Sequence, residues 1–445
     1  MITANIGRSF LNHYNQKNGL NLSAKEFFEQ VFFKLFYDHP KYLYWVTNSP
    51  FVQMKQGQKP NNLTSNERLE KLEDLHQKIE NKIIDASTTI GFAASEAKEF
   101  ATTSGQVTDL AIETTPEMVY CSWIGGGLGV GVGGGQVILF DNSVVFDVLL
   151  QGWQMYRDYL NDPAYEGLSG NKINSWNGQW LSHVLGTDYK IDDPLQNFGG
   201  LETTKEGIEI PPQSWLKVIL AISRKVPLPS MTGYIYKHGQ TNSTYGFIPF
   251  NLKTIKRPSE LYIKLFGEYA YQKDARTIET LYGSAASFQR ICQMGAVGVA
   301  ALEPKGLKDI MKGDKSFKFD NKPETQITFN TYLTWTLAML NNDEFWDEAG
   351  TAAELFVTYE AGAGKLRADR GNQIEKIKTA MSKRACLDAF VPVLEKVETL
   401  QMANWIALTK RIHQLPSDMF SYFMTLVKLR HTEKSRTNSN ETITQ

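Results

Sequence analysis

Two segments near the N-terminus have the spacing of apolar and polar residues that is typical of helices. Ser23 and Glu26 are spaced as a capping box, and the apolar-rich segment that follows runs to about Tyr37. Between Asn66 and Asp85 apolar residues recur every three or four positions, which predicts a second helix with one core-facing stripe. The residues of this stripe are Leu69, Leu72, Leu75, Ile79 and Ile83.

The middle of the chain alternates between regular and irregular patterns. Val144 to Leu160 has a helical pattern. From Asn161 to about Tyr245 six prolines interrupt the pattern, which predicts loops and short strands around one apolar piece, Trp215 to Ser223. The helical pattern returns from Tyr262 to Leu302.

Between Gly125 and Gly135, eight of the eleven residues are glycine. The run contains a G-x-G-x-x-G sequence, at Gly129, Gly131 and Gly134, which binds dinucleotides when a strand precedes it and a helix follows. Here the flanking segments, Met118 to Ile124 and Gln136 to Phe140, both have the composition of strands. The run therefore predicts a β-hairpin with an exposed tip that lacks side chains. A loop that binds a nucleotide or a phosphorylated ligand, and a connector without a function, are the alternatives.

After Thr325 nearly every segment is compatible with a helix, and no strand is expected there. The predicted helical segments are 327–341, 343–360, 374–396, 400–410 and 417–429. We therefore predict an α+β fold, in which an irregular mixed N-terminal body with a glycine-rich β-hairpin precedes an all-helical C-terminal bundle. The predicted boundaries are a body over 1–304, a lysine-rich linker over 305–323, a bundle over 324–430 and a disordered tail over 431–445.

Composition indicates a globular protein and a cytoplasmic location. Of 445 residues, 42% are hydrophobic and 21% charged, as is usual for globular proteins. No stretch approaches the length of a membrane span, and the N-terminus lacks the apolar core of a signal peptide. Cys121, Cys292 and Cys386 are too few and too far apart for a disulfide framework or a zinc site. We expect no cofactor, no metal and no membrane partner.

The net charge of −1 conceals an uneven distribution of charge. Residues 361–445 contain 14 Lys and Arg against eight Asp and Glu, whereas the remaining 360 residues contain 33 against 40. A basic C-terminal region favours a polyanionic partner.

The sequence contains no recognisable catalytic motif. No H-E-x-x-H or G-x-S-x-G pattern is present. Asp192-Asp193 and Asp343-Glu344 pair carboxylates, but adjacent acids point in different directions and are typical of solvated loops and helix starts. His183 and His413 have no evident partner and are interpreted as structural. We predict a protein without catalytic activity.

Three groups of residues favour nucleic-acid binding. The first is the basic side chains of the C-terminal helices, for which a solvated helix face is the alternative. The second is Ser169 to Trp180, where amides and Lys172 accompany two tryptophans; a turn anchored by buried Trp176 and Trp180 is the alternative. The third is the polar loop from Lys237 to Thr244, for which an idle hairpin tip is the alternative.

The chain resembles the large subunit of type I CRISPR interference complexes, which are called Cascade. The resemblance is carried by Lys410-Arg-Ile-His-Gln-Leu-Pro-Ser-Asp-Met-Phe-Ser-Tyr-Phe-Met-Thr-Leu-Val-Lys-Leu-Arg430, which is similar to the closing helices of that family's helical domain. The order of an irregular body and a basic bundle is similar as well. The paired C-x-x-C zinc motifs of some subtypes are missing here.

The resemblance implies a non-catalytic subunit that recognises the PAM in double-stranded target DNA, aids R-loop formation and holds the displaced strand. Implied partners are CRISPR RNA, other Cascade subunits, and a recruited helicase-nuclease or transposition adaptor. Met311 is a candidate internal start for a separate helical domain. Candidate duplex contacts are Gly127, Gly129, Gly131, Asn171, Lys172, Asn174, Asn177, Gln179, Lys253, Lys256 and Arg257. Candidate contacts to the displaced strand are Lys365, Arg367, Arg370, Lys376, Lys383, Arg384, Lys410 and Arg411.

On this interpretation the glycine tip approaches DNA where a side chain would clash, so Gly127→Val or Gly131→Val would impair DNA binding and leave the fold intact. Two other classes of function are kept as alternatives. One is a cytoplasmic enzyme that binds a nucleotide or a phosphorylated ligand at the glycine run. The other is a structural assembly protein whose hairpin packs against a neighbouring subunit.

Overall fold

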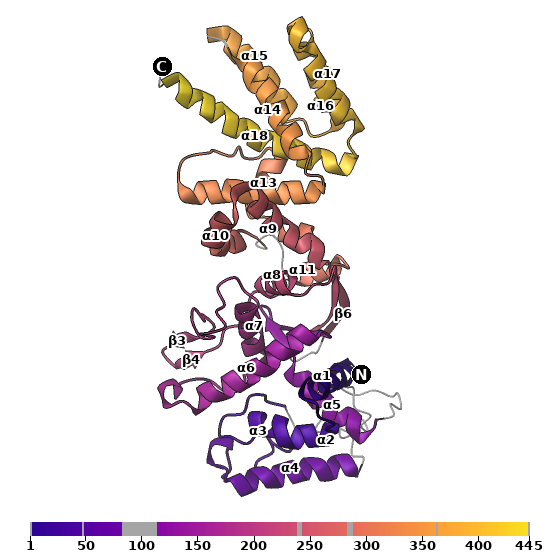
Figure 1. Ribbon diagram of the computed structural model, residues 1–445, viewed down its shortest axis with the longest axis vertical. Helices are drawn as coiled ribbons and strands as arrows, with labels where there is room; N and C mark the ends of the chain where they lie inside the picture. Colours follow the sequence, from indigo (N-terminus) through magenta and orange to yellow (C-terminus); the bar gives the residue numbers. More distant parts are fainter. Residues whose placement is uncertain are drawn as a thin grey trace. The chain divides into compact units, whose positions relative to one another are not determined.

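The computed structural model describes residues 2–46, 49–81, 114–237, 243–282, 288–361 and 364–443. The fold is α+β, with a small antiparallel sheet and a helical C-terminal region, as the sequence predicts (Figure 1). The chain divides into two compact units. The first unit contains Met1–Leu252 and Phe288–Val297, and the second contains Lys253–Ser287 and Gly298–Gln445.

This division differs from the predicted boundaries. Residues 253–287 and 298–304, predicted in the N-terminal body, belong with the helical unit. Within that unit Trp335 donates its indole N–H to the Val299 carbonyl at 3.0 Å, and Tyr332 donates its hydroxyl to the Lys305 carbonyl at 2.5 Å. The segment predicted as a linker also packs into the unit, because Leu307 and Ile310 of a short helix are buried.

The first unit contains both sheets and nine of the described α-helices. Its helices and helical turns are α1 (Ile2–Asn18), α2 (Ala24–Phe27), η1 (Phe28–Phe32), α3 (Phe33–Phe36), η2 (Pro60–Asn62), α4 (Ser65–Glu80), α5 (Pro116–Gly127), α6 (Ser143–Asn161), η4 (Pro163–Tyr165), α7 (Ile173–Val184), α8 (Trp215–Lys225) and α11 (Phe288–Gln293); α2 to α3 form one helix with a π-helical turn in the middle. Its strands are β1 (Val130–Val132), β2 (Gln136–Phe140), β3 (Glu202–Thr204), β4 (Gly207–Glu209), β5 (Met231–Lys237) and β6 (Ser243–Phe250).

The larger sheet is antiparallel throughout and has the strand order β1-β2-β5-β6. Ile138 of β2 pairs with Val130 on one side and Ile235 on the other. One face of the sheet carries Ile138, Ile235 and Phe250, all of them buried. The smaller sheet pairs β3 with β4 alone.

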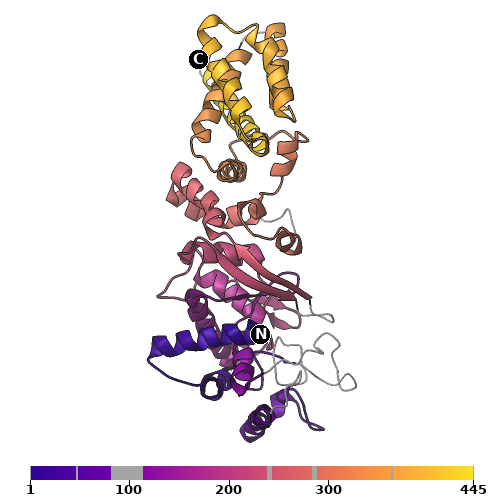
Figure 2. The ribbon, with the colours of Figure 1, turned by 90° about the vertical axis from the view of Figure 1, so that its right-hand side faces the viewer.

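Aromatic side chains form the centre of the first unit between the N-terminal helices and α6. Trp153 of α6 meets Phe36 edge to face, with ring centroids 4.9 Å apart, and Phe36 stacks on Phe32 at 4.0 Å. Helices α1 and α5 lie side by side (Figures 1 and 2). Their backbones approach closely because Gly7 faces Gly125. This packing explains why glycine is required at both positions.

The second unit is helical throughout the part of it that the structure describes. Its helices and helical turn are α9 (Leu252–Phe266), α10 (Glu268–Leu281), η5 (Val299–Leu302), α12 (Leu307–Lys312), α13 (Pro323–Leu340), α14 (Phe345–Glu360), α15 (Gly364–Lys378), α16 (Lys383–Leu394), α17 (Thr399–Gln414) and α18 (Ser417–Ile443).

Several helices match the predicted segments, because their ends carry clear signals. Ser23 and Glu26 form the predicted capping box, and Thr64 and Glu67 form another at the start of α4. The stripe on α4 is partly confirmed: Leu72, Leu75 and Ile79 are buried, Ile83 lies outside the described residues, and Leu69 is 52% exposed.

Three predicted elements differ from the structure. The segment from Met118 to Ile124 is helical and not a strand, because Thr115 caps α5, Pro116 occupies its first position and neighbouring elements bury it on all sides. The helix predicted over 374–396 is broken, since Ser382 accepts from the Ala385 N–H and starts α16. The tail predicted to be disordered continues α18, in which Arg436 donates to the Phe319 carbonyl at 2.7 Å.

Candidate nucleic-acid interface

The glycine run is mostly buried. Gly127 ends α5, and Gly129 and Gly131 lie at the start of the hairpin between β1 and β2. The Asn177 side-chain amide donates to the carbonyls of Gly127 and Gly129 at 2.8 and 2.9 Å, and Asn174 also donates to Gly129 at 2.8 Å. Helix α7 therefore holds the run in place through its own amides.

Side chains do not fit at these glycines. A Cβ at Gly129 would lie 2.6 Å from the Asn174 side-chain nitrogen, and one at Gly131 would lie 2.8 Å from the Asn174 backbone carbon. A Cβ at Gly127 would lie 3.0 Å from the rings of Phe32 and Phe36. The interpretation of these three glycines as an exposed approach surface is therefore wrong, and valine at Gly127 or Gly131 would disturb the fold.

A hairpin is present and its second strand is as predicted, but its first strand is Val130–Val132 within the glycine run and not Met118 to Ile124, so the tip is shorter than predicted. Strands β1 and β2 pair antiparallel, and the exposed tip consists of Gly134 and Gly135. Both have positive φ, at 87° and 75°, a conformation that glycine adopts without strain. At Gly129 and Gly131, where a dinucleotide would meet the G-x-G-x-x-G pattern, Asn174 fills the space.

The segment from Ser169 to Trp180 also has mainly a structural role. It forms most of α7, in which Trp176 and Trp180 are fully buried, so burial of the tryptophans is confirmed within a helix rather than a turn. Gln179 donates to the Pro211 carbonyl at 2.8 Å and is 8% exposed. Asn174, Asn177 and Gln179 thus satisfy backbone groups of the first unit. Asn171 and Lys172 are exposed, and Lys172 lies 3.6 Å from Glu209.

Residues 238–242 of the third predicted group, the loop from Lys237 to Thr244, lie outside the described residues.

Lys253, Lys256 and Arg257 belong to α9 and therefore to the second unit. Lys253 is exposed, and Lys256 is paired with Glu260 at 3.2 Å. Arg257 binds Asp343 at 2.5 Å and is 29% exposed.

In the acidic pair Asp343-Glu344, the Asp343 carboxylate is neutralised by cations of the chain itself. Lys264 donates to Asp343 at 2.6 Å, and this bond together with the Arg257 guanidinium lowers the pKa of the Asp343 carboxyl. Across the described residues, no three His, Cys, Asp or Glu side chains are grouped as a metal site requires.

The basic side chains of the C-terminal helices fall into two sets. Three of them stabilise the unit. Arg370 donates to the carbonyls of Tyr359 and Ala361, at 3.2 and 3.0 Å. Lys383 donates to the Leu415 carbonyl at 2.7 Å, and Arg411 binds Glu348 at 2.7 Å while its guanidinium lies 4.6 Å from the Phe345 ring centre.

The other five are exposed and have no hydrogen-bond or ion-pair partner among the described residues. We call them the free cations: Lys365, Arg367 and Lys376 of α15, Arg384 of α16 and Lys410 of α17. Residues 364–414 contain ten Lys and Arg against five Asp and Glu. This part of the second unit therefore presents positive charge that the protein itself does not neutralise.

Two of the free cations lie on the same side of α15. Lys365 and Lys376 are eleven residues apart, or about three helical turns and roughly 16 Å along the axis. Ile374 and Ile377 are buried on the opposite side of this helix. Lys396, in the turn between α16 and α17, is a further exposed lysine without a partner among the described residues. It is not among the sequence candidates, although it is the last residue of the segment predicted as a helix over 374–396.

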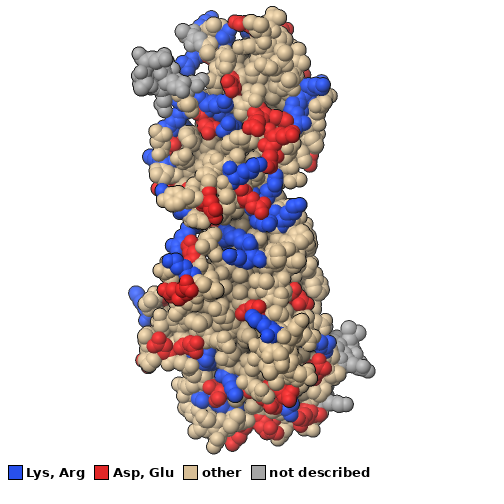
Figure 3. Space-filling model, in the orientation of Figure 1, with Lys and Arg blue, Asp and Glu red and all other residues tan. Residues whose placement is uncertain are grey.

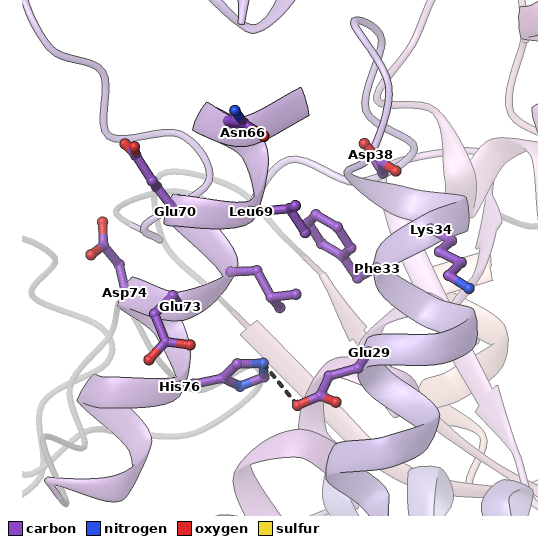
Figure 4. Close-up of a pocket in the computed structure, with 11 residues that line it drawn as sticks. Glu29, Phe33, Lys34, Asp38, Asn66, Leu69, Glu70, Glu73, Asp74 and His76 are labelled. Carbon is purple, nitrogen blue, oxygen red and sulfur yellow. Dashed lines mark ion pairs between the residues drawn. The ribbon is translucent and has the colours of Figure 1, made fainter. Parts of the chain in front are cut away.

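An acidic groove of about 820 Å³ lies between α3 and α4 in the first unit (Figure 4). Phe33 and Leu69 point toward each other across it. Its lining includes Glu29, Asp38, Glu70, Glu73 and Asp74, and among the described residues that line it Lys34 is the only Lys or Arg. Acidic side chains also gather over α4 in the space-filling view (Figure 3). This charge repels a phosphate backbone, so the groove is unsuited to nucleic acid.

In the lining of this groove, His76 links a carboxylate to a tyrosine. Its Nε2 lies 3.2 Å from Glu29, and its Nδ1 lies 2.6 Å from the Tyr120 hydroxyl. Burial lowers the pKa of His76 and raises that of Tyr120. A tyrosine whose pKa is raised is a weak nucleophile at neutral pH. The arrangement therefore closes the helix interface and does not activate Tyr120.

Comparison with family models, curated proteins and solved structures gives no match for this chain. Among the described residues no helix has both the length and the apolar character needed to cross a membrane. The three cysteines are buried, and burial raises the pKa of Cys121 and Cys292 to about 11 and that of Cys386 to about 12.

Proposed function

We propose that this chain is a non-catalytic DNA-binding protein whose helices α15 to α17 hold single-stranded DNA along its backbone. The observation that carries the proposal is the set of free cations, five exposed Lys and Arg without an acidic partner among the described residues. Flexible basic side chains bind phosphates without regard to sequence, as a subunit that holds a displaced strand requires.

The finer proposal follows from the resemblance to the large subunit of Cascade. It adds that the protein acts in an RNA-guided complex, where guide pairing supplies sequence specificity and the protein recognises the PAM. For duplex recognition the exposed candidates are Asn171, Lys172 and Lys253, since the glycines, Asn177 and Gln179 are buried and the half-buried Asn174 is bound to the Gly129 carbonyl. Purification of the tagged chain from its own cells is expected to yield short RNAs with one invariant segment beside variable ones; absence of RNA contradicts the finer proposal.

Replacement of the five free cations by alanine tests the DNA-binding proposal. For single strands, log K falls with log salt concentration by about 0.7 per phosphate contact, so losing five contacts lowers the slope by roughly three to four. We expect the variant to bind a thymidine oligonucleotide far more weakly than the parent at low salt. Affinity is measured by fluorescence anisotropy at several salt concentrations.

A matched control removes the same charge from elsewhere. Lys59, Lys190, Lys205, Lys217 and Lys225 are exposed lysines of the first unit, and their replacement by alanine gives the same net charge. The control is expected to retain the parental slope. Equal losses in both variants would show that only total charge matters, and an unchanged slope in the test variant would contradict the proposal.

A further inference from the structure

A second basic feature of the helical unit is a pocket of about 360 Å³, which we call the Lys428 pocket. Three parts of the unit line it. The loop after α12 contributes Asp314, Lys315 and Ser316, the end of α15 contributes Lys378, and α18 contributes Lys428. None of the free cations lines this pocket, so the two sites share no basic side chain, although both use α15.

The three lysines differ in how their charges are balanced. Lys378 is paired with Glu375 at 2.8 Å, and Lys315 is paired with Asp309 at 2.9 Å. Lys428 is partly buried and has no hydrogen-bond or ion-pair partner for its ammonium among the described residues. Its ammonium is therefore the one of the three that has no direct partner, and Glu375 acts on it only through space.

An uncompensated ammonium is costly when it is partly buried. Burial lowers the pKa of Lys428, and Lys378 lowers it further, whereas Glu375 acts in the opposite direction. A bound anion would remove this cost, because it supplies the missing opposite charge. The pocket thus stabilises an anion more strongly than an exposed lysine does.

The donors indicate which anion fits. Each lysine ammonium has three N–H donors, so Lys315 and Lys378 retain donors beyond their ion pairs. Ser316 adds a hydroxyl. Asp314 and Glu375 also line the pocket and oppose an anion, which limits the charge that the site accepts. Several donors that converge around one unpaired cation match the oxygens of a phosphate group.

We propose that the Lys428 pocket binds a phosphate group, supplied as inorganic phosphate or as a phosphate of a nucleotide chain.

The test uses the full chain and measures its melting temperature with increasing inorganic phosphate against sodium chloride of equal ionic strength. The parent is expected to gain stability progressively as the site fills. Lys428→Met keeps a side chain of similar length without the charge, and should weaken phosphate binding by about tenfold or more. Asp314→Asn removes one of the two opposing carboxylates and should strengthen binding.

Two controls separate site binding from general effects of salt. Lys396→Met removes an exposed lysine of the same unit that does not line the pocket, and it should respond to phosphate as the parent does. Phosphate stabilises many proteins by exclusion from their surfaces, an effect that Lys428→Met would retain. If the shift is the same in the parent and in Lys428→Met, the proposal is wrong. If Lys428→Met fails to fold, Lys428→Gln and Asp314→Asn carry the same comparison.

A 5′-phosphorylated thymidine dinucleotide and its unphosphorylated form distinguish the two sources. Stronger binding of the phosphorylated dinucleotide than of inorganic phosphate assigns the pocket to a nucleic-acid phosphate, and equal binding assigns it to free phosphate. If neither inorganic phosphate nor the phosphorylated dinucleotide binds, the proposal is wrong. Because the pocket shares no residue with the free cations, failure of one proposal leaves the other standing.

Discussion

Single glycines determine how closely α1 and α5 approach. A Cβ at Gly125 would lie 1.9 Å from the Thr3 carbonyl oxygen, and one at Gly7 would lie 1.9 Å from the Cys121 carbonyl oxygen. The nearest atoms belong to backbone, which cannot rotate away as a side chain does. Even one methyl group at either position therefore forces the helices apart.

Gly125→Ala is expected to lower the free energy of unfolding by at least about 2 kcal/mol, because the added methyl overpacks the helix crossing. Urea unfolding followed by circular dichroism measures this change. Gly133→Ala is the matched control, since its nearest neighbour is the Gln213 carbonyl at 4.0 Å. Equal stability of the two variants would contradict the described packing.

Protonation of His39 makes the stability of the first unit depend on pH. Burial and the charge of Arg157 lower its pKa to about 4, while the Lys41 N–H donates to its Nδ1 at 2.9 Å. In an unfolded chain the pKa of histidine is about 6.5. Between these values the unfolded chain binds more protons than the folded one, so the free energy of unfolding falls as pH decreases from about 6.5 towards 4.

His39→Asn removes the titration and keeps an acceptor for Lys41. We expect its free energy of unfolding to depend less on pH than that of the parent between pH 7 and 4, as measured by urea unfolding. His76 and His183 also have lowered pKa values, so some dependence on pH remains in the variant. If the free energy of unfolding depends on pH to the same extent in the parent and in the variant, His39 does not cause this dependence.

At the scale of elements, the sequence predicts helices best where a capping residue marks their start. The box of Ser23 and Glu26 was identifiable, and Ser382, which starts α16, would have revealed the break between α15 and α16. Helix α5 was missed because neighbours bury it on all sides, so its apolar residues show no helical period. Its cap, Thr115 with Pro116, was the available signal.

The candidate site was predictable only in part, because charge is visible in a sequence and its neutralisation is not. The basic character of residues 364–414 was evident. The sequence does not show that the unit itself supplies partners for Arg370, Lys383 and Arg411, because these contacts join segments that are distant in sequence. Likewise, Asn174 and Asn177 have amide side chains of the kind that read bases. Both donate their N–H groups to carbonyls of the glycine run instead.

At the scale of the whole molecule, charge is distributed between the two units. The first contains the acidic groove between α3 and α4, whereas the second contains the free cations and the Lys428 pocket. We therefore expect single-stranded DNA to bind to the second unit, as proposed above.

Photo-crosslinking of the full chain to a thymidine oligonucleotide, with the attached peptides mapped by mass spectrometry, tests this assignment most directly. We expect crosslinks within residues 364–414, and we expect their loss when the five free cations are replaced by alanine. Crosslinks concentrated in the first unit, or crosslinks in residues 364–414 that persist in that variant, would contradict it.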